Sequence, residues 1–209
     1  MKIIESSFSI EEEIDPEKIM SVIEKAGRTC YKSESGISDG SAEKFIKNIL
    51  KRGHESVIEH EKITVRIICD RGVSHEIVRH RIASFSQEST RYCNYSKDRF
   101  GGELTFIKPC FWNEKNPEDM EKYNIWKESM AYIEKQYNSL IKMGAKPEEA
   151  RSVLPNSLKT EIVVTMNLRQ WRHFFRLRTD LAAHPQIREI ADAMLLEFKK
   201  ILPAIFSDI

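Results

Sequence analysis

Apolar residues recur at helical spacing in several segments of the chain. After Pro16, Ile19 and Ile23 fall on one face, and Asp15 precedes them as a potential N-cap. This pattern predicts an amphipathic helix that ends near Gly27. The same reasoning predicts further helices over residues 42–52, 72–81, 117–143, 146–153, 168–178 and 186–201. In the long helix 117–143, Ile125, Met130 and Tyr137 are among the candidate core residues.

Alternation of apolar and polar residues marks the strands. Residues 62–69 (KITVRIIC) alternate and are rich in β-branched side chains, and residues 159–166 show a similar pattern. Two shorter strands are expected over residues 3–7 and 103–107. Residues 82–96 lack clean periodicity. Because helices and strands alternate irregularly, we predict an α+β fold: a mixed sheet with helices packed on it.

Length and charge narrow the picture. The chain has 209 residues, of which 41% are hydrophobic, and this fits a single domain over residues 1–209. The formal net charge of +1 does not favour nucleic acid or an acidic membrane as a partner. The longest apolar runs, such as residues 162–166, are too short to span a bilayer, and the N-terminus has no apolar signal core. We therefore expect a cytoplasmic protein with no membrane partner.

No cofactor-binding or metal-binding motif of the common kinds is present. GxGxxG and GxxxxGK[ST] are both absent, which argues against a Rossmann site and a P-loop. Zinc-binding helices place histidines at i and i+4, whereas His75 and His80 are five residues apart. We predict no metal and reduced thiols, because no pair has metal or redox spacing among Cys30, Cys69, Cys93 and Cys110.

The stretch RHRIASFSQESTRYCNY, residues 79–95, carries an unusual density of hydrogen-bond donors. Arg79, His80 and Arg81 are consecutive, and on the predicted helix they would point about 100° apart. Hydroxyl, amide and guanidinium groups follow within fifteen residues, a set suited to phosphates and to the edge of a planar base. The alternative is a solvated basic loop with ordinary turn residues.

A second cationic cluster lies in NLRQWRHFFRLR, residues 167–178. Asn167 and Gln170 form a capping-box pattern at the start of this helix. One face carries core aromatic residues and the other carries Arg169, Arg172, His173 and Arg176. Such cations repel one another, so a polyanionic ligand or a partner subunit would explain them. Neutralisation by the nearby acids Asp180 and Glu189 is the alternative.

Four segments together resemble a known family. Arg79-His80-Arg81, seven residues and then Ser89 form the RHR-x7-S signature of the flavin-dependent thymidylate synthases. GHES at residues 53–56 with Glu59-His60, ARSVLP at residues 150–155 and TMNLRQWRHFFRLR at residues 165–178 are similar to family segments in order and spacing. The resemblance covers about residues 28–201. It implies the thymidylate-synthase-complementing-protein-like fold.

The resemblance also implies the residues of two sites. The implied FAD-binding residues are His54, Ser56, Arg79, His80, Arg81, Gln87, Asn167, Arg169 and His173. The implied dUMP-binding residues are Glu76, Arg79, Gln87, Glu88, Ser89, Thr90, Arg91, Arg151 and Arg178. Gln87 stands where many relatives have glutamate, so it keeps the capacity for hydrogen bonds but not the charge.

The implied reaction is the reductive methylation of dUMP to dTMP. FAD is the bound cofactor, and 5,10-methylenetetrahydrofolate and NADPH are co-substrates. Arg178 is the implied catalytic residue, which stabilises negative charge on the uracil ring. We interpret Ser89 as a dUMP-binding residue and not a nucleophile, because no activating base and orienting group can be identified around it. The family also implies a homotetramer whose active sites are shared between subunits.

Two other classes of function remain open at this point. A nucleic-acid-binding module could use the basic segments, although the balanced charge argues against it. A flavoprotein reductase with another substrate would oxidise NADPH without dUMP. A structural protein gives no reason for the arginine clusters.

Overall fold

The computed structural model describes residues 1–98 and 100–209 of the chain. These residues form two compact units. Unit 1 comprises Met1–Phe8, Ile67–Arg79 and Phe85–Val163. Unit 2 comprises Ser9–Arg66, His80–Ser84 and Val164–Ile209. The single domain expected from the length stays a prediction.

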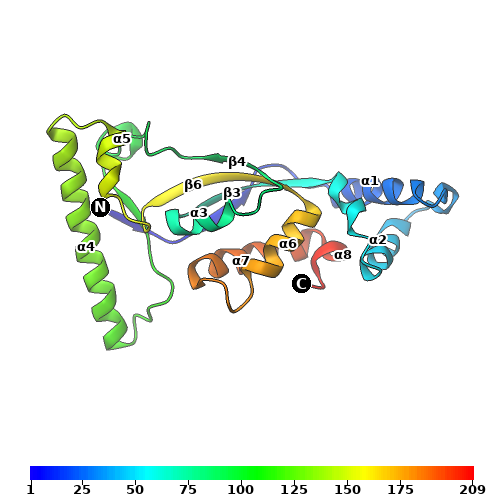
Figure 1. Cartoon of the computed structure of the whole chain (residues 1–209). Coiled ribbons are helices and arrows are strands. Elements are labelled where there is room, and N and C mark those ends of the chain that lie inside the picture. The colour runs from blue at the N-terminus through cyan, green and yellow to red at the C-terminus, as the bar shows by residue number, and fades with distance from the viewer. The chain divides into compact units, whose positions relative to one another are not determined.

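The strands form two sheets (Figure 1). The larger sheet has the order β2-β3-β6-β4, with β2 at Ser7–Ile10, β3 at Lys62–Asp70, β6 at Lys159–Asn167 and β4 at Ser84–Gln87. In the smaller sheet β1 (Lys2–Ile4) pairs in parallel with β5 (Thr105–Ile107). With the helices described below, these sheets confirm the α+β class.

Strands β3, β5 and β6 lie where alternation predicts them, but the single strand expected over residues 3–7 is wrong. The chain forms β1 and β2 there instead. The sequence did not predict β4 either. Three of its four residues, Ser84, Ser86 and Gln87, are polar, so no apolar alternation marks it. Its place in the sheet is set by the neighbouring strand β6.

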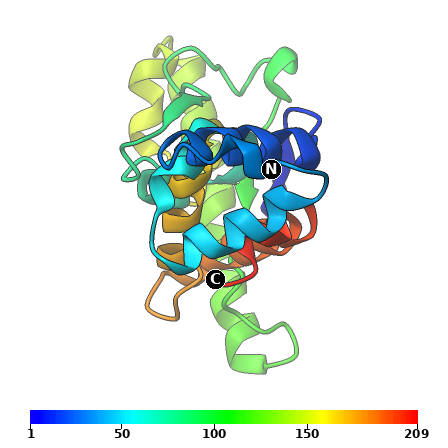
Figure 2. The same ribbon diagram turned by 90° about the vertical axis from the view of Figure 1, so that its right-hand side faces the viewer.

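Seven helical segments lie in unit 2: α1 (Pro16–Thr29), η1 (Glu34–Gly36), α2 (Ser41–Lys51), η2 (Glu55–His60), α6 (Leu168–Arg178), α7 (Pro185–Ile201) and α8 (Pro203–Phe206). Asp15 caps α1 by accepting a hydrogen bond from the Lys18 backbone N–H at 3.0 Å. Gly27 does not end this helix, contrary to expectation. A Cβ at Gly27 would lie 2.6 Å from Cε1 of Phe45, so the glycine allows α1 and α2 to pack side by side (Figure 2).

The core of unit 2 is aromatic. Trp171, Phe174 and Phe175 on α6 are fully buried, as the apolar face of this segment predicts. Phe198 of α7 and Phe206 of α8 both pack edge-on against Phe175, with ring centroids 5.0 and 5.9 Å from that of Phe175. The apolar face of α6 is therefore anchored in the core, and its opposite face carries Arg169, His173 and Arg176.

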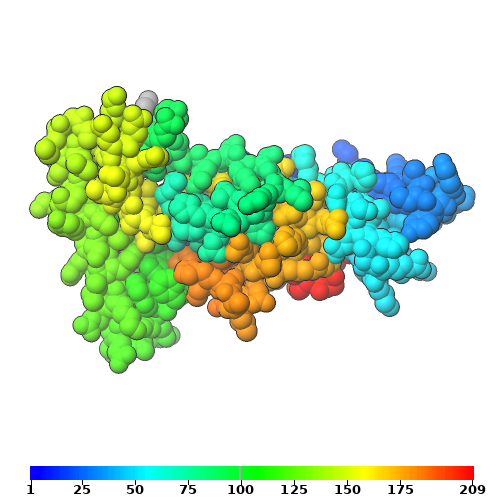
Figure 3. All heavy atoms as spheres, in the orientation of Figure 1, coloured from blue at the N-terminus to red at the C-terminus, as the bar shows by residue number. Residues whose placement is uncertain are grey.

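The helical segments of unit 1 are α3 (Arg71–Ile77), η3 (Asp98–Phe100), α4 (Pro117–Lys142), α5 (Pro147–Ala150) and η4 (Arg151–Val153). Met130 and Tyr137 of α4 are buried in a core with Phe106 and Leu158. Ile125, a candidate core residue, is instead 60% exposed. Figure 3 shows atoms of α4, in light green, along the surface.

Helix α3 ends four residues before the predicted boundary. It stops at Ile77, and a turn at Val78 and Arg79 follows. Arg79, His80 and Arg81 therefore do not lie on a helix, and the 100° spacing expected for their side chains does not apply. His80 is 4% exposed and packs edge-on against Phe174, with ring centroids 5.0 Å apart.

Among the helices of the described residues, none is long and apolar enough to cross a membrane. In the same part of the chain, no group of three or more His, Cys, Asp or Glu side chains is arranged to hold a metal ion.

Candidate functional site

Gln87, at the end of β4, is held by two buried hydroxyl groups of unit 1. Its Nε2 donates to Oγ of Ser74 at 2.9 Å and to Oγ1 of Thr160 at 3.2 Å. The Ser74 hydroxyl donates its own proton to the backbone oxygen of Arg71, 2.9 Å away. Because a hydroxyl has one proton to donate, Ser74 can only accept from Gln87. This requirement fixes the orientation of the Gln87 amide.

The carboxylate of Glu88 is fully engaged by its neighbours. The Tyr95 hydroxyl donates to its Oε1 at 2.7 Å, and Lys159 Nζ donates to its Oε2 at 2.7 Å. The Glu88 backbone N–H donates to the Glu161 oxygen on β6 at 2.8 Å. Burial and the Glu88 carboxylate both raise the pKa of the Tyr95 hydroxyl, so Tyr95 stays protonated and acts as the donor.

A tight turn follows at Ser89. The backbone N–H groups of Tyr92 and Cys93 donate to the Ser89 backbone oxygen, at 3.2 and 3.0 Å. The Ser89 hydroxyl accepts from the Arg91 backbone N–H at 3.3 Å. The turn is the scaffold for the residues after Ser89.

Two arginines from distant segments meet at this turn. Arg151 of η4 extends its Nη1 to 3.5 Å from Oγ1 of Thr90. Nε of Arg91 lies 3.9 Å from Oε2 of Glu148 on α5, and its side chain is 55% exposed. The structure therefore places Arg151 beside Thr90 and Arg91 beside Glu148, three residues before Arg151 in the chain. The assignment of these residues to dUMP stays a prediction. Glu76 and Arg79 are joined at the end of α3, where the Arg79 backbone N–H donates to the Glu76 oxygen at 3.3 Å.

Unit 2 contains a pocket of about 360 Å³ that is lined by residues assigned to flavin. Asn167, Arg169 and His173 of this lining are three of the predicted FAD-binding residues. Asn167 is the N-cap of α6 and accepts from the Gln170 backbone N–H at 2.8 Å, which confirms half of the predicted capping box. The Gln170 side chain lies beside His80 instead of returning to the cap. The remaining lining residues are Glu55, Glu59, Ile82, Gln170 and Arg176. Guanidinium, imidazole and amide groups line this one space together with the carboxylates of Glu55 and Glu59.

The arginines of α6 are neutralised by acids that are remote in sequence. Glu55 accepts from Nε of Arg172 at 3.3 Å and from Nη2 of Arg176 at 3.1 Å. Arg169 pairs with Glu59 at 2.5 Å. Neutralisation by acidic side chains, the alternative to a polyanionic ligand, is therefore confirmed for Arg169, Arg172 and Arg176. The acids that pair with them are not the expected Asp180 and Glu189.

Arg172 departs most from the sequence pattern. It was placed on the polar face of α6, but its side chain is 1% exposed. Both Nη groups bind the Asp208 carboxylate, at 2.6 and 2.7 Å, and Nη1 also donates to the Ile205 backbone oxygen. Burial is tolerated because every face of the guanidinium meets an acceptor.

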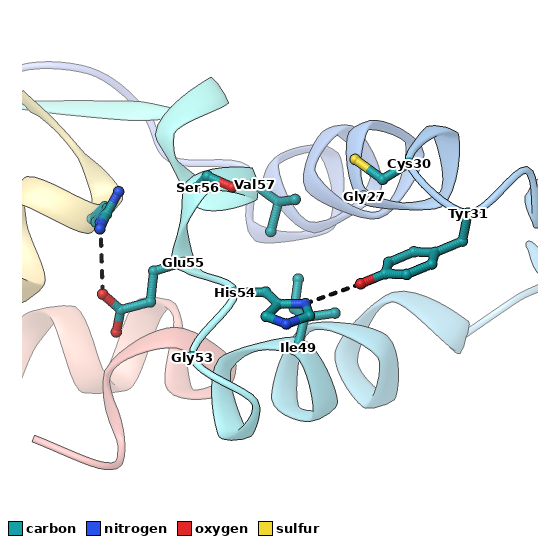
Figure 4. Close-up of a pocket in the computed structure, with 10 residues that line it drawn as sticks. Gly27, Cys30, Tyr31, Ile49, Gly53, His54, Glu55, Ser56 and Val57 are labelled. Carbon is teal, nitrogen blue, oxygen red and sulfur yellow. Dashed lines mark hydrogen bonds and ion pairs between the residues drawn. The ribbon is translucent and has the colours of Figure 1, made fainter.

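A second pocket of about 410 Å³ lies beside the first in unit 2, and the two share Glu55 and Arg169 as lining residues. His54 and Ser56, both assigned to FAD, line it. The Tyr31 hydroxyl lies 3.0 Å from Nδ1 of His54 and holds the imidazole between α1 and α2 (Figure 4). Sequence reasoning did not single out Tyr31, which lies 23 residues from His54.

His80 is a neutral, buried imidazole between two side chains of α6. Nε of Arg178 donates to its Nε2 at 3.1 Å, so the ring proton must lie on Nδ1. Nε2 of the Gln170 amide lies 3.3 Å from Nδ1. Because both of these nitrogens would carry protons, a hydrogen bond here requires the amide to turn its oxygen toward Nδ1. Burial, and then the charges of Arg178 and His173, lower the His80 pKa to about 4.

The predicted residues divide between the two units. Of the FAD set, all but Arg79 and Gln87 belong to unit 2. Of the dUMP set, all but Arg178 belong to unit 1. Tyr95 belongs to the donor-rich stretch of residues 79–95, but its bond to Glu88 could not be foreseen from the sequence. Sequence reasoning missed Lys159, Ser74 and Thr160, since no motif marks them and only the fold brings them to Gln87 and Glu88.

Comparison with known proteins identifies the family. Residues 14–204 match the family described as "Thymidylate synthase complementing protein". The flavin-dependent thymidylate synthase of Pyrococcus furiosus is 42% identical over 175 residues, which are 83% of this chain and 69% of the relative. That of Pyrococcus abyssi is 41% identical over 165 residues, 78% of this chain and 65% of the relative. That of Geobacter sulfurreducens is 35% identical over 205 residues, 93% and 82% of the two chains.

A solved structure supports the fold. The crystal structure of the UMP/dUMP methylase PolB from Streptomyces cacaoi, bound with 5-Br dUMP, superposes with a TM-score of 0.81. It covers 99% of this chain and 96% of the other, at 22% identity. From the sequence match over nearly its whole length, this chain belongs to the thymidylate synthase complementing protein family, the flavin-dependent thymidylate synthases.

Proposed function

We propose that this chain methylates dUMP to dTMP with FAD as its bound cofactor and 5,10-methylenetetrahydrofolate and NADPH as co-substrates. The observation that carries the proposal is the pocket of unit 2 that gathers Asn167, Arg169 and His173 in one place. The sequence resemblance independently implies that these three residues bind flavin. The membership of the chain in a family of flavin-dependent thymidylate synthases supports the same reaction.

The donors of this pocket suit FAD, although two carboxylates share its lining. Asn167 and His173 supply groups that can hydrogen-bond to a planar ring. Arg169 and Arg176 are paired with Glu59 and Glu55, so they would have to exchange these carboxylates for the pyrophosphate. When bound, FAD would supply the redox chemistry of the reaction. His54 and Ser56 would complete the site from the adjoining pocket. His80 and Arg81 remain proposed flavin contacts, together with Arg79 and Gln87.

The chain's own residues would bind and polarise dUMP. Arg151, which contacts Thr90, and Arg91, the next residue in the chain after Thr90, would hold the phosphate. Gln87, Ser89 and the backbone of Glu88 would position the nucleotide, with Glu76 and Arg79 beside them. Arg178 would stabilise the negative charge that develops on the uracil ring, because its guanidinium is fixed by His80.

A homotetramer with shared active sites is part of the proposal. Ile125 and Tyr132 of α4 are 60% and 64% exposed and lie seven residues apart, on one face of the helix. Such a face suits contact with another subunit. Mass photometry of the purified protein tests the subunit number. The cytoplasmic location stays a prediction.

The decisive test is product formation. Purified protein is incubated anaerobically with FAD, NADPH and methylenetetrahydrofolate, with and without dUMP, and dTMP is measured by mass spectrometry. We expect dTMP only when both dUMP and FAD are present. NADPH oxidation that does not depend on dUMP, without dTMP, would instead indicate a flavoprotein reductase. Failure to take up flavin would contradict the proposal.

A further inference from the structure

The segment proposed to bind the phosphate of dUMP carries a carboxylate. Glu88 precedes Ser89 directly and is two residues from Thr90, whose hydroxyl lies 3.5 Å from Arg151 Nη1. Successive Cα atoms are about 3.8 Å apart, so Glu88 lies within roughly one Debye length of this arginine contact. An unpaired carboxylate at this distance would repel a phosphate dianion. Something must offset its charge.

Lys159 is placed to do so. Its Nζ donates to Oε2 of Glu88 at 2.7 Å and to Oε2 of Glu161 at 3.4 Å. The side chains of Glu88 and Lys159 are 17% and 20% exposed, so water screens the pair only partly. Burial opposes the charge on Lys159, yet its two carboxylate partners leave its pKa above the ordinary value. Lys159 is therefore a permanent cation.

The same contacts fix the conformation of the segment. Tyr95 donates to the other oxygen of Glu88 at 2.7 Å, and the Glu88 backbone is bonded to β6 at Glu161. Glu88 is thus held by three contacts: the Lys159 side chain on β6, the Tyr95 side chain after the Ser89 turn, and its own backbone bond to Glu161. The turn at Ser89 begins at the next residue.

We propose, on the basis of the proposed function, that Lys159 and Tyr95 are positioning residues for dUMP and act through Glu88. Lys159 neutralises the Glu88 carboxylate, so that the nucleotide phosphate can bind beside it. Tyr95 and Lys159 together hold the segment Gln87–Arg91 in its binding conformation. Neither residue touches the reacting atoms.

The test compares four variants of the full-length protein loaded with FAD. Lys159→Met leaves Glu88 charged and unpaired, and we expect it to raise the KM for dUMP roughly five- to tenfold. The kcat at saturating dUMP should stay within about twofold, because the reacting atoms are not involved. Lys159→Arg keeps the charge and should restore a KM close to that of the unaltered protein. Lys122→Met, which removes an exposed lysine paired with Asp119 on α4, is the control.

The double variant Glu88→Gln/Lys159→Met separates neutralisation from packing. It removes both charges, and the amide oxygen still accepts from Tyr95, so its KM should fall back toward that of the unaltered protein. Added salt should reduce the defect of Lys159→Met more than that of the double variant, in which only the partly exposed Glu161 carboxylate has lost the lysine. The flavin absorbance and the melting temperature are measured for each variant, as checks of flavin binding and folding.

The possible outcomes separate failure of this inference from failure of the proposed function. An unchanged KM in Lys159→Met would overturn it. If the double variant has the same raised KM for dUMP as Lys159→Met at every salt concentration, Lys159 acts only through packing, and the electrostatic role is overturned. If the unaltered protein neither binds dUMP nor forms dTMP, the proposed function itself fails. If it does both and the variants match it, the inference alone fails.

Discussion

Arg178 donates a hydrogen bond from its Nε to Nε2 of His80, 98 residues earlier in the chain, at 3.1 Å. His80 is buried against Phe174 and has lost the ability to be charged near neutral pH. A neutral imidazole is the right partner for this arginine, because an imidazolium would have no lone pair at Nε2 to accept the bond. The relationship fixes the plane of a guanidinium that we propose to be catalytic.

Arg178→Ala should lower kcat about a hundred- to a thousandfold, the usual cost of removing one donor aimed at a developing negative charge. Flavin content should change little, because the flavin pocket is lined by other residues of α6. The measurement is the initial rate of dTMP formation at saturating dUMP. Arg188→Ala is the matched control, since this partly exposed arginine of α7 donates to the backbone oxygen of Leu181, in the loop before the helix. Equal rates in both variants would remove Arg178 from the mechanism.

His80 should make the stability of the protein depend on pH. Its pKa of about 4 lies below the ordinary value of 6.5. Between these values the unfolded chain binds a proton that the native chain does not, so stability is complete above about pH 6.5 and falls as the pH falls toward 4. The loss should be about 2 kcal/mol between pH 6.5 and 5. Urea unfolding at several pH values measures it, and His80→Gln should show a shallower slope over this range. An identical slope in both proteins would contradict the assignment.

Gln87→Glu should make unfolding easier at pH 8 than at pH 5. The Gln87 amide donates to two buried hydroxyls, and Ser74 has already committed its proton to Arg71. A carboxylate there would have to turn the Ser74 hydroxyl, and burial would raise its pKa. A group with a raised native pKa contributes stability below its unfolded pKa, about 4.3, and loses it as the pH rises. We expect a loss of about 1–3 kcal/mol at pH 8. Gln87→Leu, which cannot ionise, should lack this pH dependence.

The sequence predicts an element correctly where the residues of one short segment are enough to define it. Strand β6 and helix α6 follow directly from local alternation and helical spacing, and the Asn167 cap lies three residues from its partner. Strand β4 could not be predicted because its pairing with β6 defines it, whereas its own side chains show no apolar alternation. The resemblance likewise named Arg178, but it could not show that His80 holds it. Contacts between residues about 100 positions apart, such as Arg172 with Glu55, depend on the tertiary fold.

Glu24→Ala should destabilise the helical pair α1 and α2 strongly. Glu24 is 3% exposed, accepts from Nε of Arg28 at 2.8 Å, and accepts from the Ser41 hydroxyl at 2.7 Å. Removing it leaves a half-buried guanidinium without its carboxylate, which typically costs about 3–5 kcal/mol. The melting temperature should fall by roughly 10 °C. Glu43→Ala is the control, because the exposed pair between Glu43 and Lys47 should contribute less than about 0.5 kcal/mol. Similar falls in melting temperature for Glu24→Ala and Glu43→Ala would show that burial does not strengthen the Glu24–Arg28 pair.

Ser89→Ala tests whether this serine is a nucleophile. The hydrogen bond at its hydroxyl comes from the Arg91 backbone N–H, and an amide N–H cannot take up the serine proton. A serine nucleophile needs a base for that step. We therefore expect Ser89→Ala to keep turnover within about tenfold of the unaltered protein and to raise the KM for dUMP, because the variant loses a bond within the turn.

The measurements for Ser89 are kcat, the KM for dUMP and the mass of the protein after quenching in acid. Ser86→Ala, on an exposed position of β4, is the matched control for loss of a hydroxyl. A binding role predicts no covalent nucleotide on the quenched protein and a defect mainly in KM. Complete loss of turnover with unaltered dUMP binding, together with an adduct that Ser89→Ala abolishes, would establish a nucleophile. In that case the base that takes up the Ser89 proton would have to come from the substrate or from another subunit, because the Ser89 hydroxyl contacts only the Arg91 backbone N–H among the bonds described above.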